Sequence, residues 1–471
     1  MVPSHHERMH PIRSQSLSKH AIASEQSLSA TPRIVEKPAK KNLQRFTPPE
    51  IASIADTGLN LGFLADLTLK VMYFEGTISG YDIAQRVKLP FAGVIEEALE
   101  FLRREQFCEV RGARGLGESS YQYTITDRGC EKAREVLERS MYVGPAPVPL
   151  QTYAASIRQQ PLQDVNFHPA TIRQMLSHLV LSEEIFNQIG PAVNSGRSIF
   201  IFGPPGNGKT VIAESIGRML MTDDMYIPYA FEVDGHVVKV FDEVSHQVVD
   251  GLTRAEAGTT AFLKGRKRDD RWVKIKRPVI AVGGELTLEA LDLVFDEISK
   301  YYEAPFQVKA NGGMFLIDDF GRQRMRPREL LNRWIIPLEK RIDYLTLHTG
   351  RKIEVPFDML IVFSTNLEPK QLVEEAFLRR IRHKIQIGNP SFEQFREIFR
   401  RLCQDKRVPY DDQALAYLLQ EHYIKKKRPL RACHPRDLLD ELLDFANFIN
   451  VTPQLNKETL DKACEAYFVE L

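Results

Sequence analysis

The chain has 471 residues, enough for roughly two to four domains, each with its own hydrophobic core. Its 63 Lys and Arg side chains against 62 Asp and Glu side chains leave a net charge of +1, which excludes a global field that would draw the protein onto nucleic acid or an anionic membrane. No apolar stretch is long enough to span a bilayer, and the N-terminus has no apolar signal core. We therefore expect a cytoplasmic protein without membrane insertion.

Residues 1–47 are rich in Ser, His, Pro and basic side chains and lack a periodic apolar pattern, so we expect a disordered tail. Residues 48–142 are patterned as one domain. Their periodicity predicts helices over 61–73, 81–87, 91–104 and 127–137, and strands over 107–110 and 121–125. Three helices followed by a β-hairpin resemble a winged-helix domain, and Tyr121–Gly129 (YQYTITDRG) is similar to the wing-to-helix segment of that family.

The third helix of this domain would enter the major groove if the domain bound DNA. It carries only two bases, Arg103 and Arg104, against four acids: Glu96, Glu97, Glu100 and Glu105. Because basic side chains supply most of the affinity for phosphates, this charge favours docking to a protein. Arg111 and Arg114 in the wing soften the argument without reversing it.

Residues 143–168 are expected to form a linker, stiffened by alternating prolines, and 172–188 to form an entry helix. The central motif follows the apolar run 198–202 and precedes a helical pattern from Val211 to Leu220. It consists of Gly203, Pro204, Pro205, Gly206, Asn207, Gly208, Lys209 and Thr210. A strand, a glycine-rich turn and a helix in this order are the context that a phosphate-binding loop requires.

The residue types of this loop suit a nucleoside triphosphate. The glycines let successive backbone N–H groups turn inward around an anion, and the helix adds its positive N-terminal end. Lys209 has the length and charge to reach the β- and γ-phosphates, and the Thr210 hydroxyl can ligate Mg²⁺. We therefore expect residues 203–211 to bind the nucleotide.

Two later apolar runs end in polar side chains that complement the loop. The first, Met314–Ile317, is followed by Asp318 and Asp319. We assign Asp318 to hold Mg²⁺, and Asp319 to orient and deprotonate the attacking water. The second run ends in Asn366, whose amide can bond the γ-phosphate or the lytic water.

Two further segments lie nearer the C-terminus, Glu374–Ile381 (EEAFLRRI) and His434–Leu439 (HPRDLL). With the phosphate-binding loop, the acid pair and Asn366, in this order, they resemble the AAA+ ATPases over roughly residues 170–450. The resemblance implies an α/β fold in which a P-loop NTPase αβα core with a parallel sheet occupies 169–388 and a small helical lid occupies 389–471. It also implies that the nucleotide is ATP.

The resemblance further implies roles for individual residues. Asn366 matches sensor 1, Arg379 or Arg380 matches the arginine finger, and Arg436 in the lid matches sensor 2. Because a finger reaches the neighbour's nucleotide, it implies a homo-oligomeric ring, usually a hexamer. This family usually has Glu where the chain has Asp319, and the shorter side chain predicts turnover that is slow or dependent on loop movement.

The core also carries an insertion, expected at about 226–305, because Lys209 and Asp318 are too far apart for one helix and one strand. Within it we predict a hairpin around Asp234-Gly235 and a helix over 286–301. Between them lies a basic cluster of Lys264, Arg266, Lys267, Arg268 and Arg271.

Gly312-Gly313, just before the acid-bearing strand, resembles the helix-2-insert or MoxR-like branch of the AAA+ proteins. Phe306 and the basic cluster are the candidates for gripping a substrate, against the simpler interpretation of the cluster as a solvated loop. Five arginines follow the acid pair closely: Arg322, Arg324, Arg326, Arg328 and Arg333. They suit contact with a neighbour's phosphates, a subunit interface, or pairing with acids such as Glu329 and Glu339.

These observations favour an ATPase ring that remodels an unknown protein client. Two alternatives stay open. One is a DNA-dependent ATPase or regulator that uses the winged helix and the basic loop, although nucleic acid is not the favoured partner. The other is a slow nucleotide-gated switch or scaffold, consistent with Asp319 in place of Glu.

Overall fold

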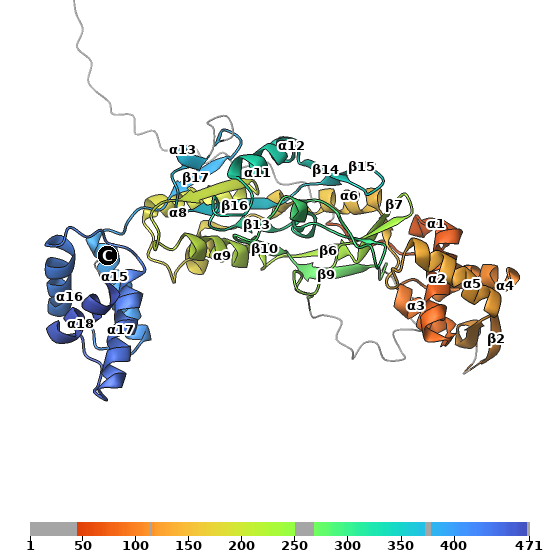
Figure 1. Ribbon diagram of the computed structural model, residues 1–471, viewed down its shortest axis with the longest axis horizontal. Coiled ribbons are helices and arrows are strands. Elements are labelled where there is room, and N and C mark those ends of the chain that lie inside the picture. Colours follow the sequence, from red (N-terminus) through yellow and green to blue (C-terminus); the bar gives the residue numbers. More distant parts are fainter. Residues whose placement is uncertain (1–44, 114, 116, 250–267, 373–377, 469–471) are drawn as a thin grey trace, which may run out of the picture. The chain divides into compact units, whose positions relative to one another are not determined.

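The computed structural model describes residues 45–113, 115, 117–249, 268–372 and 378–468 (Figure 1). The disordered tail expected at 1–47 therefore lies almost wholly outside the described residues, as do Lys264, Arg266 and Lys267 of the basic cluster. No helix within the described ranges combines the length and the apolar character needed to cross a membrane.

A parallel sheet of five strands forms the centre of the core. Its order is β10 (Val279–Val282), β13 (Met314–Ile317), β16 (Leu360–Thr365), β5 (Ser198–Phe202) and β17 (His383–Gln386). These strands are short, nearly continuous apolar runs, as expected where both faces of a parallel sheet are covered.

Alternate side chains of the sheet pack into two separate hydrophobic layers. On one face, Ile199, Ile201 and their neighbours pack against α7 (Pro169–Met175), α8 (Glu183–Asn194) and α9 (Lys209–Leu220). On the other face, Phe200 and Phe363 pack with residues of α11 (Pro327–Arg333) and with the fully buried Trp334 that precedes α12 (Ile335–Lys340). Figure 1 shows α9 and the α11–α12 pair on opposite sides of the sheet. The core is therefore a three-layer αβα domain.

The expected hairpin is confirmed as β7 (Ala230–Val233) and β8 (His236–Lys239), which pair antiparallel. Asp234 and Gly235 both adopt positive φ, 54° and 80°, as a two-residue turn between twisted strands requires. The hairpin joins a mixed sheet in the order β11 (Val294–Phe295), β12 (Tyr302–Glu303), β8, β7 and β4 (Val148–Pro149). Nearby, β6 (Asp224–Pro228) pairs with β9 (Trp272–Lys276), and β14 (Ile342–Thr346) with β15 (Lys352–Pro356).

The helix predicted over 286–301 is wrong. This stretch holds a short 3-10 turn (Glu289–Leu291), then β11 and the approach to β12. The Asp296 carboxylate accepts hydrogen bonds from the N–H groups of Ile298 and Ser299, and Lys300 adopts a φ of 56°. Such a local turn competes with helix formation. In addition, β10 belongs to the core sheet although it lies within the stretch expected as an insertion.

The entry helix predicted over 172–188 is two helices. α7 ends at Met175, and α8 begins at Glu183 after Ser182, whose side chain accepts the N–H of Ile185. Ser182 is thus a helix N-cap, a signal that the apolar periodicity on either side of it concealed.

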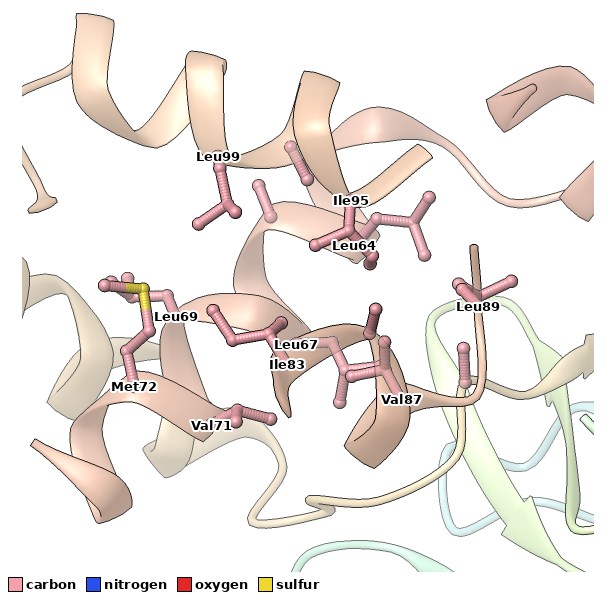
Figure 2. Close-up of a cluster of buried hydrophobic side chains, with 14 of the residues drawn as sticks. Leu64, Leu67, Leu69, Val71, Met72, Ile83, Val87, Leu89, Ile95 and Leu99 are labelled. Atoms are coloured by element: carbon pink, nitrogen blue, oxygen red, sulfur yellow. The ribbon is translucent and has the colours of Figure 1, made fainter. Parts of the chain in front are cut away.

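The described part of the N-terminal unit contains five α-helices, two short helical turns of other types (Phe91–Ile95 and Glu118–Ser120) and a small antiparallel sheet in the order β1, β3, β2. Its elements are α1 (Ile54–Thr57), α2 (Leu61–Glu75), β1 (Thr77–Ser79), α3 (Gly80–Val87), α4 (Glu96–Arg104), β2 (Cys108–Ala113), β3 (Tyr121–Ile125) and α5 (Asp127–Arg139). Leu64, Leu67, Ile83, Ile95 and Leu99 form part of its core (Figure 2).

Four helices form the C-terminal unit, with a hydrophobic core of their own. They are α15 (Phe392–Asp405), α16 (Asp412–Leu418), α17 (His434–Phe448) and α18 (Lys457–Tyr467). Phe395, Phe399, Leu439 and Leu442 are fully buried in this core. The unit coincides with the region expected to form a lid.

Candidate functional site

The loop between β5 and α9 has the backbone of an anion cradle. Gly203, Gly206 and Gly208 adopt φ values of 142°, 79° and 81°, which strain any residue with a Cβ. A Cβ on Gly203 would also lie 2.1 Å from the backbone oxygen of Ile387. The loop runs directly into the first turn of α9, so its N–H groups and the positive end of the helix serve the same site.

Lys209 spans this loop. Its Nζ donates a hydrogen bond to the Pro204 carbonyl oxygen across 2.9 Å. Burial lowers the pKa of Lys209, the negative charges of Asp318 and Asp319 raise it, and Arg431 lowers it further. The ammonium group therefore sits next to two acids and against the loop backbone, where a phosphate would exchange with the carbonyl as its partner.

Thr210 and Asp318 form an oxygen pair beside the loop. The Thr210 hydroxyl donates to Oδ2 of Asp318 across 2.9 Å, and the N–H of Asp319 donates to Oδ1 of the same carboxylate across 3.0 Å. Asp318 follows β13 directly, and its own N–H bonds the carbonyl of Val282 at the end of β10. Hydroxyl and carboxylate oxygens are the ligands that Mg²⁺ prefers, so the donor set fits this ion.

Asp319 and Asn366 are brought together at the ends of β13 and β16. The Asn366 amide donates to Oδ1 of Asp319 across 3.1 Å. Asp319 adopts a φ of 49°, an uncommon left-handed conformation for a residue with a side chain. The segments that carry the two residues are also tied, because the N–H of Phe320 bonds the Ser364 carbonyl and the Thr365 hydroxyl bonds the Phe320 carbonyl.

Asn207 connects the loop to the C-terminal unit. Its side chain accepts the N–H of Ala432 across 3.0 Å and donates to Oδ1 of Asn389 across 2.9 Å. The N–H of Cys433 also donates to the Gly206 carbonyl across 2.8 Å. We call these contacts the Asn207 clasp. Pro204, Pro205 and Val211 occupy the remaining expected positions; the Val211 side chain is exposed on α9.

A cavity of about 630 Å³ opens beside Asn207. Its walls come from the start of α8, the end of β17 and the C-terminal unit, and include Ile185, Gln188, Ile387 and Asn389. Mixed apolar and polar walls next to a phosphate loop suit the base and ribose of a nucleotide.

Arg436, expected as sensor 2, lies on α17 with its guanidinium on the carboxylate of the adjacent Asp437. Arg431 lies next to the loop, because its Cδ is 3.6 Å from the position of a Cβ built on Gly206 and its charge acts on Lys209. Sequence reasoning missed Arg431, because no motif marks it among the many bases of the C-terminal unit.

Arg379 and Arg380 lie at the opposite end of β5 from the phosphate loop. The Ser198 hydroxyl, at the start of β5, bonds the Arg380 carbonyl and the N–H of Arg382. Arg380 Nε contacts the Glu339 carboxylate across 2.6 Å. A cavity of about 320 Å³ here is lined largely by cations, namely Arg197, Arg341, Arg379, Arg380, Arg382 and Lys384. These arginines therefore do not face the nucleotide loop of their own chain.

Phe306 and Arg271, two of the residues expected to contact a substrate, lie in different parts of the structure. Phe306 begins α10 (Phe306–Lys309) and stacks on the buried Phe315, so its ring is part of the core packing. Arg271 is buried with Asp269, and it also donates to the carbonyls of Thr57 and Pro147. Arg271 therefore ties segments of the chain together and is not part of an exposed basic patch.

Comparisons with known proteins give one family match and several distant structural likenesses. Residues 391–466, within the C-terminal unit, match a family described as a domain of unknown function (DUF8689). No match to the chain was found among the curated proteins.

Among solved structures, the chain is similar to NtrX from Brucella abortus, with 15% sequence identity and a TM-score of 0.37. The alignment covers 63% of this chain and 57% of the NtrX chain. The structure of NtrX from Brucella abortus in complex with ATP gives 17% identity and a TM-score of 0.35, and the alignment covers 78% of this chain and 68% of the NtrX chain. RuvB from Thermotoga maritima, a Holliday junction branch migration motor, gives 14% identity and a TM-score of 0.35, and the alignment covers 62% of this chain and 70% of the RuvB chain. In the first alignment this chain spans less than two thirds of the NtrX chain.

The class of the fold follows from the chain's own geometry. A parallel sheet lies between helical layers, its strand β5 leads through a glycine cradle into α9, and the acids follow β13, which is separated from β5 by the central strand β16. The core is an α/β domain of the P-loop NTPase class.

Proposed function

We propose that the protein is an AAA+ ATPase that binds ATP with Mg²⁺ and hydrolyses it. The observation that carries the proposal is the convergence of Lys209, the Thr210–Asp318 pair and the Asp319–Asn366 pair at the carboxyl edge of one parallel sheet. The residues of each pair come from different elements, Thr210 from α9, the two acids from the end of β13 and Asn366 from the end of β16, and together they would supply phosphate, metal and water contacts.

Thr210 and Asp318 would hold Mg²⁺, since their oxygens already lie 2.9 Å apart beside the loop. When bound, the ion neutralises charge on the β- and γ-phosphates. Lys209 would exchange the Pro204 carbonyl for a phosphate oxygen and bring a fixed positive charge to the same group. The neighbouring cavity would take the base and ribose.

Asp319 would act as the general base and Asn366 would position it. The carboxylate would accept a proton from the attacking water, while the hydrogen bond from the Asn366 side-chain amide to Oδ1 keeps the carboxylate oriented. Asp is one methylene shorter than the Glu that AAA+ proteins usually carry here. The left-handed backbone conformation of Asp319 changes the direction of its Cα–Cβ bond, and this change would compensate for the shorter side chain by redirecting the carboxylate toward the water.

We infer that the active form is an oligomeric ring, usually a hexamer in this family. Arg379 and Arg380 support this inference by lying at the end of β5 remote from the loop, where they are suited to a neighbour's nucleotide. Arg436 and Arg431 of the lid are both candidates for the phosphate contact that follows lid closure.

We further propose that the ring remodels a protein client, and that residues 48–142 form a winged-helix domain that docks a protein. The order of helices, strands and hairpin supports the winged-helix interpretation, and Glu97 and Glu100 lie exposed on α4. A DNA-dependent ATPase remains the second candidate, supported by the exposed Arg103 and Arg104 of the same helix.

Steady-state phosphate release and nucleotide binding test the catalytic proposal. Lys209→Ala should abolish ATP binding, and Asp319→Asn should keep binding but lower kcat by about 100-fold or more. Lys352→Ala, an exposed lysine on β15, is the matched control and should behave as wild type. Hydrolysis by Asp319→Asn at the wild-type rate would overturn the assignment of the base.

A further inference from the structure

The segment that follows the acid pair alternates between exposed and inward-facing residues. Four side chains are exposed, namely Arg322, Arg324, Arg326 and Arg328, whereas Gln323 and Pro327 are half-buried and Met325 is buried. Adjacent arginines in this pattern have Cα atoms at most about 7 Å apart. We call residues 321–328 the arginine loop.

The arginine loop is fixed at both ends and in its middle. Met325 packs in the core beside Phe320 and Leu330, and the N–H of Arg324 bonds the Gly284 carbonyl. The Glu329 carboxylate accepts the N–H of Arg326 at the start of α11. The guanidinium groups are therefore displayed from an anchored backbone, which lowers the entropy lost when they bind a partner.

Three of its four arginines lack an acidic partner within the described part of the chain, whereas Arg328 takes part in an interaction of its own. No described acid forms an ion pair with Arg322, Arg324 or Arg326, and Glu329 and Glu285 are occupied in part by backbone N–H groups. The loop therefore presents a dense positive surface at the edge of the nucleotide site.

Gln323 joins this surface to the catalytic acids. Its Nε2 donates to the Asp318 carbonyl across 2.9 Å and to the Asp319 carbonyl across 3.3 Å, and its Oε1 accepts the N–H of Gly321 across 2.7 Å. A partner that displaces the Gln323 side chain, without movement of the anchored backbone, would thus act on the left-handed turn that carries Asp319.

We propose that the arginine loop binds an acidic segment of the protein client and, through Gln323, adjusts Asp319 when the segment is present. The inference rests on the proposed remodelling function and names the chemistry of its client. Planar guanidinium groups bind carboxylates in two-point contacts, and three of them in the five residues from Arg322 to Arg326 suit a run of Asp or Glu.

One observation favours an acidic polypeptide over single-stranded nucleic acid. The only aromatic residue from Asp318 to Arg328 is Phe320, which is buried, so the loop offers no ring on which single-stranded bases can stack.

Fluorescence anisotropy on the full chain without nucleotide tests the binding step independently of hydrolysis. The probe is a labelled 12-residue Glu/Ser peptide, compared with a Gln/Ser peptide, single-stranded DNA and duplex DNA. We expect a preference for the Glu/Ser peptide, and a Kd raised roughly tenfold in the triple variant Arg322→Gln, Arg324→Gln, Arg326→Gln. The control replaces three exposed bases elsewhere with Gln, Arg158, Lys340 and Lys352, and should bind as wild type.

The coupling step is tested with Gln323→Ala. This variant should bind the Glu/Ser peptide within about twofold of wild type but lose stimulation of ATP turnover by the peptide. Three outcomes would each overturn the inference. The first is an unchanged Kd for the Glu/Ser peptide in the triple variant, and the second is tighter binding of either DNA than of the peptide. The third is a triple variant in which only the oligomeric state, measured by light scattering, is changed. Arginine-dependent peptide binding by a protein with no ATPase activity would instead refute the proposed function and leave the peptide site standing.

Discussion

The side-chain amide of Asn366 donates a hydrogen bond to Oδ1 of Asp319 across 3.1 Å. The two residues follow different strands, β16 and β13, and the connection is reinforced by the bonds between Phe320 and the Ser364–Thr365 segment. One carboxylate oxygen is therefore held from the neighbouring strand, which leaves the other as the proposed acceptor of a proton from water.

This relationship predicts that Asn366→Ala lowers kcat by roughly 10- to 100-fold with little change in KM, because a base that is no longer oriented spends less time in line with the water. Steady-state kinetics and ATP binding measured separately provide the check. Asp319→Glu serves as the comparison, since it keeps the carboxylate but changes its reach. If Asn366→Ala raises KM and leaves kcat unchanged, the amide contacts the nucleotide and does not position the base.

The Asn207 clasp predicts that Asn207→Ala loosens the C-terminal unit. The change removes two hydrogen bonds from a buried side chain and leaves the N–H of Ala432 without its partner, at a cost of about 1–3 kcal/mol. Amide hydrogen exchange of residues 432–434 and the affinity for ATP should both report the loss. Asn389→Ala breaks only one of the two bonds and should have a smaller effect. Unchanged protection of residues 432–434 in Asn207→Ala would show that the clasp does not hold the unit.

The position of Arg379 and Arg380 predicts complementation between subunits. Arg379→Ala or Arg380→Ala should lower turnover by about 100-fold or more if that residue is the finger, although its own nucleotide loop is intact. Mixing the inactive finger variant with Lys209→Ala should restore measurable turnover, because the second chain supplies the arginine that the first lacks. Activity that stays at the level of the separate variants after mixing, with mixed oligomers verified by mass, would place the arginines outside a shared site.

The core was predictable from the sequence where apolar runs were bounded by polar motifs. The strands β5, β13 and β16 each end just before a polar or glycine motif, so sequence pattern and structure agree on the positions of Gly203, Asp318 and Asn366. β10 has no such marker. Its four residues follow Pro278 inside a long excursion of the chain, and only pairing with β13 reveals that it belongs to the sheet.

The C-terminal unit shows why other parts could not be predicted. The sequence marks Arg436 by its Pro-Arg-Asp context, yet its guanidinium lies on Asp437 while Arg431 lies near Gly206. Which face of a helical unit meets the loop depends on packing between distant segments, here Asn207 with Ala432. Side-chain orientation of this kind has no local signal.

His434 provides a pH test of that packing. It lies buried between Tyr423, Tyr467 and Phe468, and its Nδ1 contacts the Tyr423 hydroxyl across 3.0 Å. Burial, together with the charges of Arg431 and Arg428 and against that of Asp437, lowers the pKa of His434 from 6.5 to about 4. The folded protein therefore keeps the ring neutral, while the unfolded chain binds a proton near pH 6.5.

The unfolded state thus gains protons before the folded state does as the pH falls, so the stabilising contribution of neutral His434 is complete above pH 6.5 and is lost between about pH 6.5 and 4. We expect the Tm of the wild type to fall more steeply over this range than that of His434→Phe, which keeps the ring but cannot take up a proton. Calorimetry of the full chain at pH 7.5, 6, 5 and 4.5 measures the difference between the two curves, which cancels the titration of the common carboxylates. Parallel curves for the two proteins would mean that protonation of His434 does not contribute to acid unfolding.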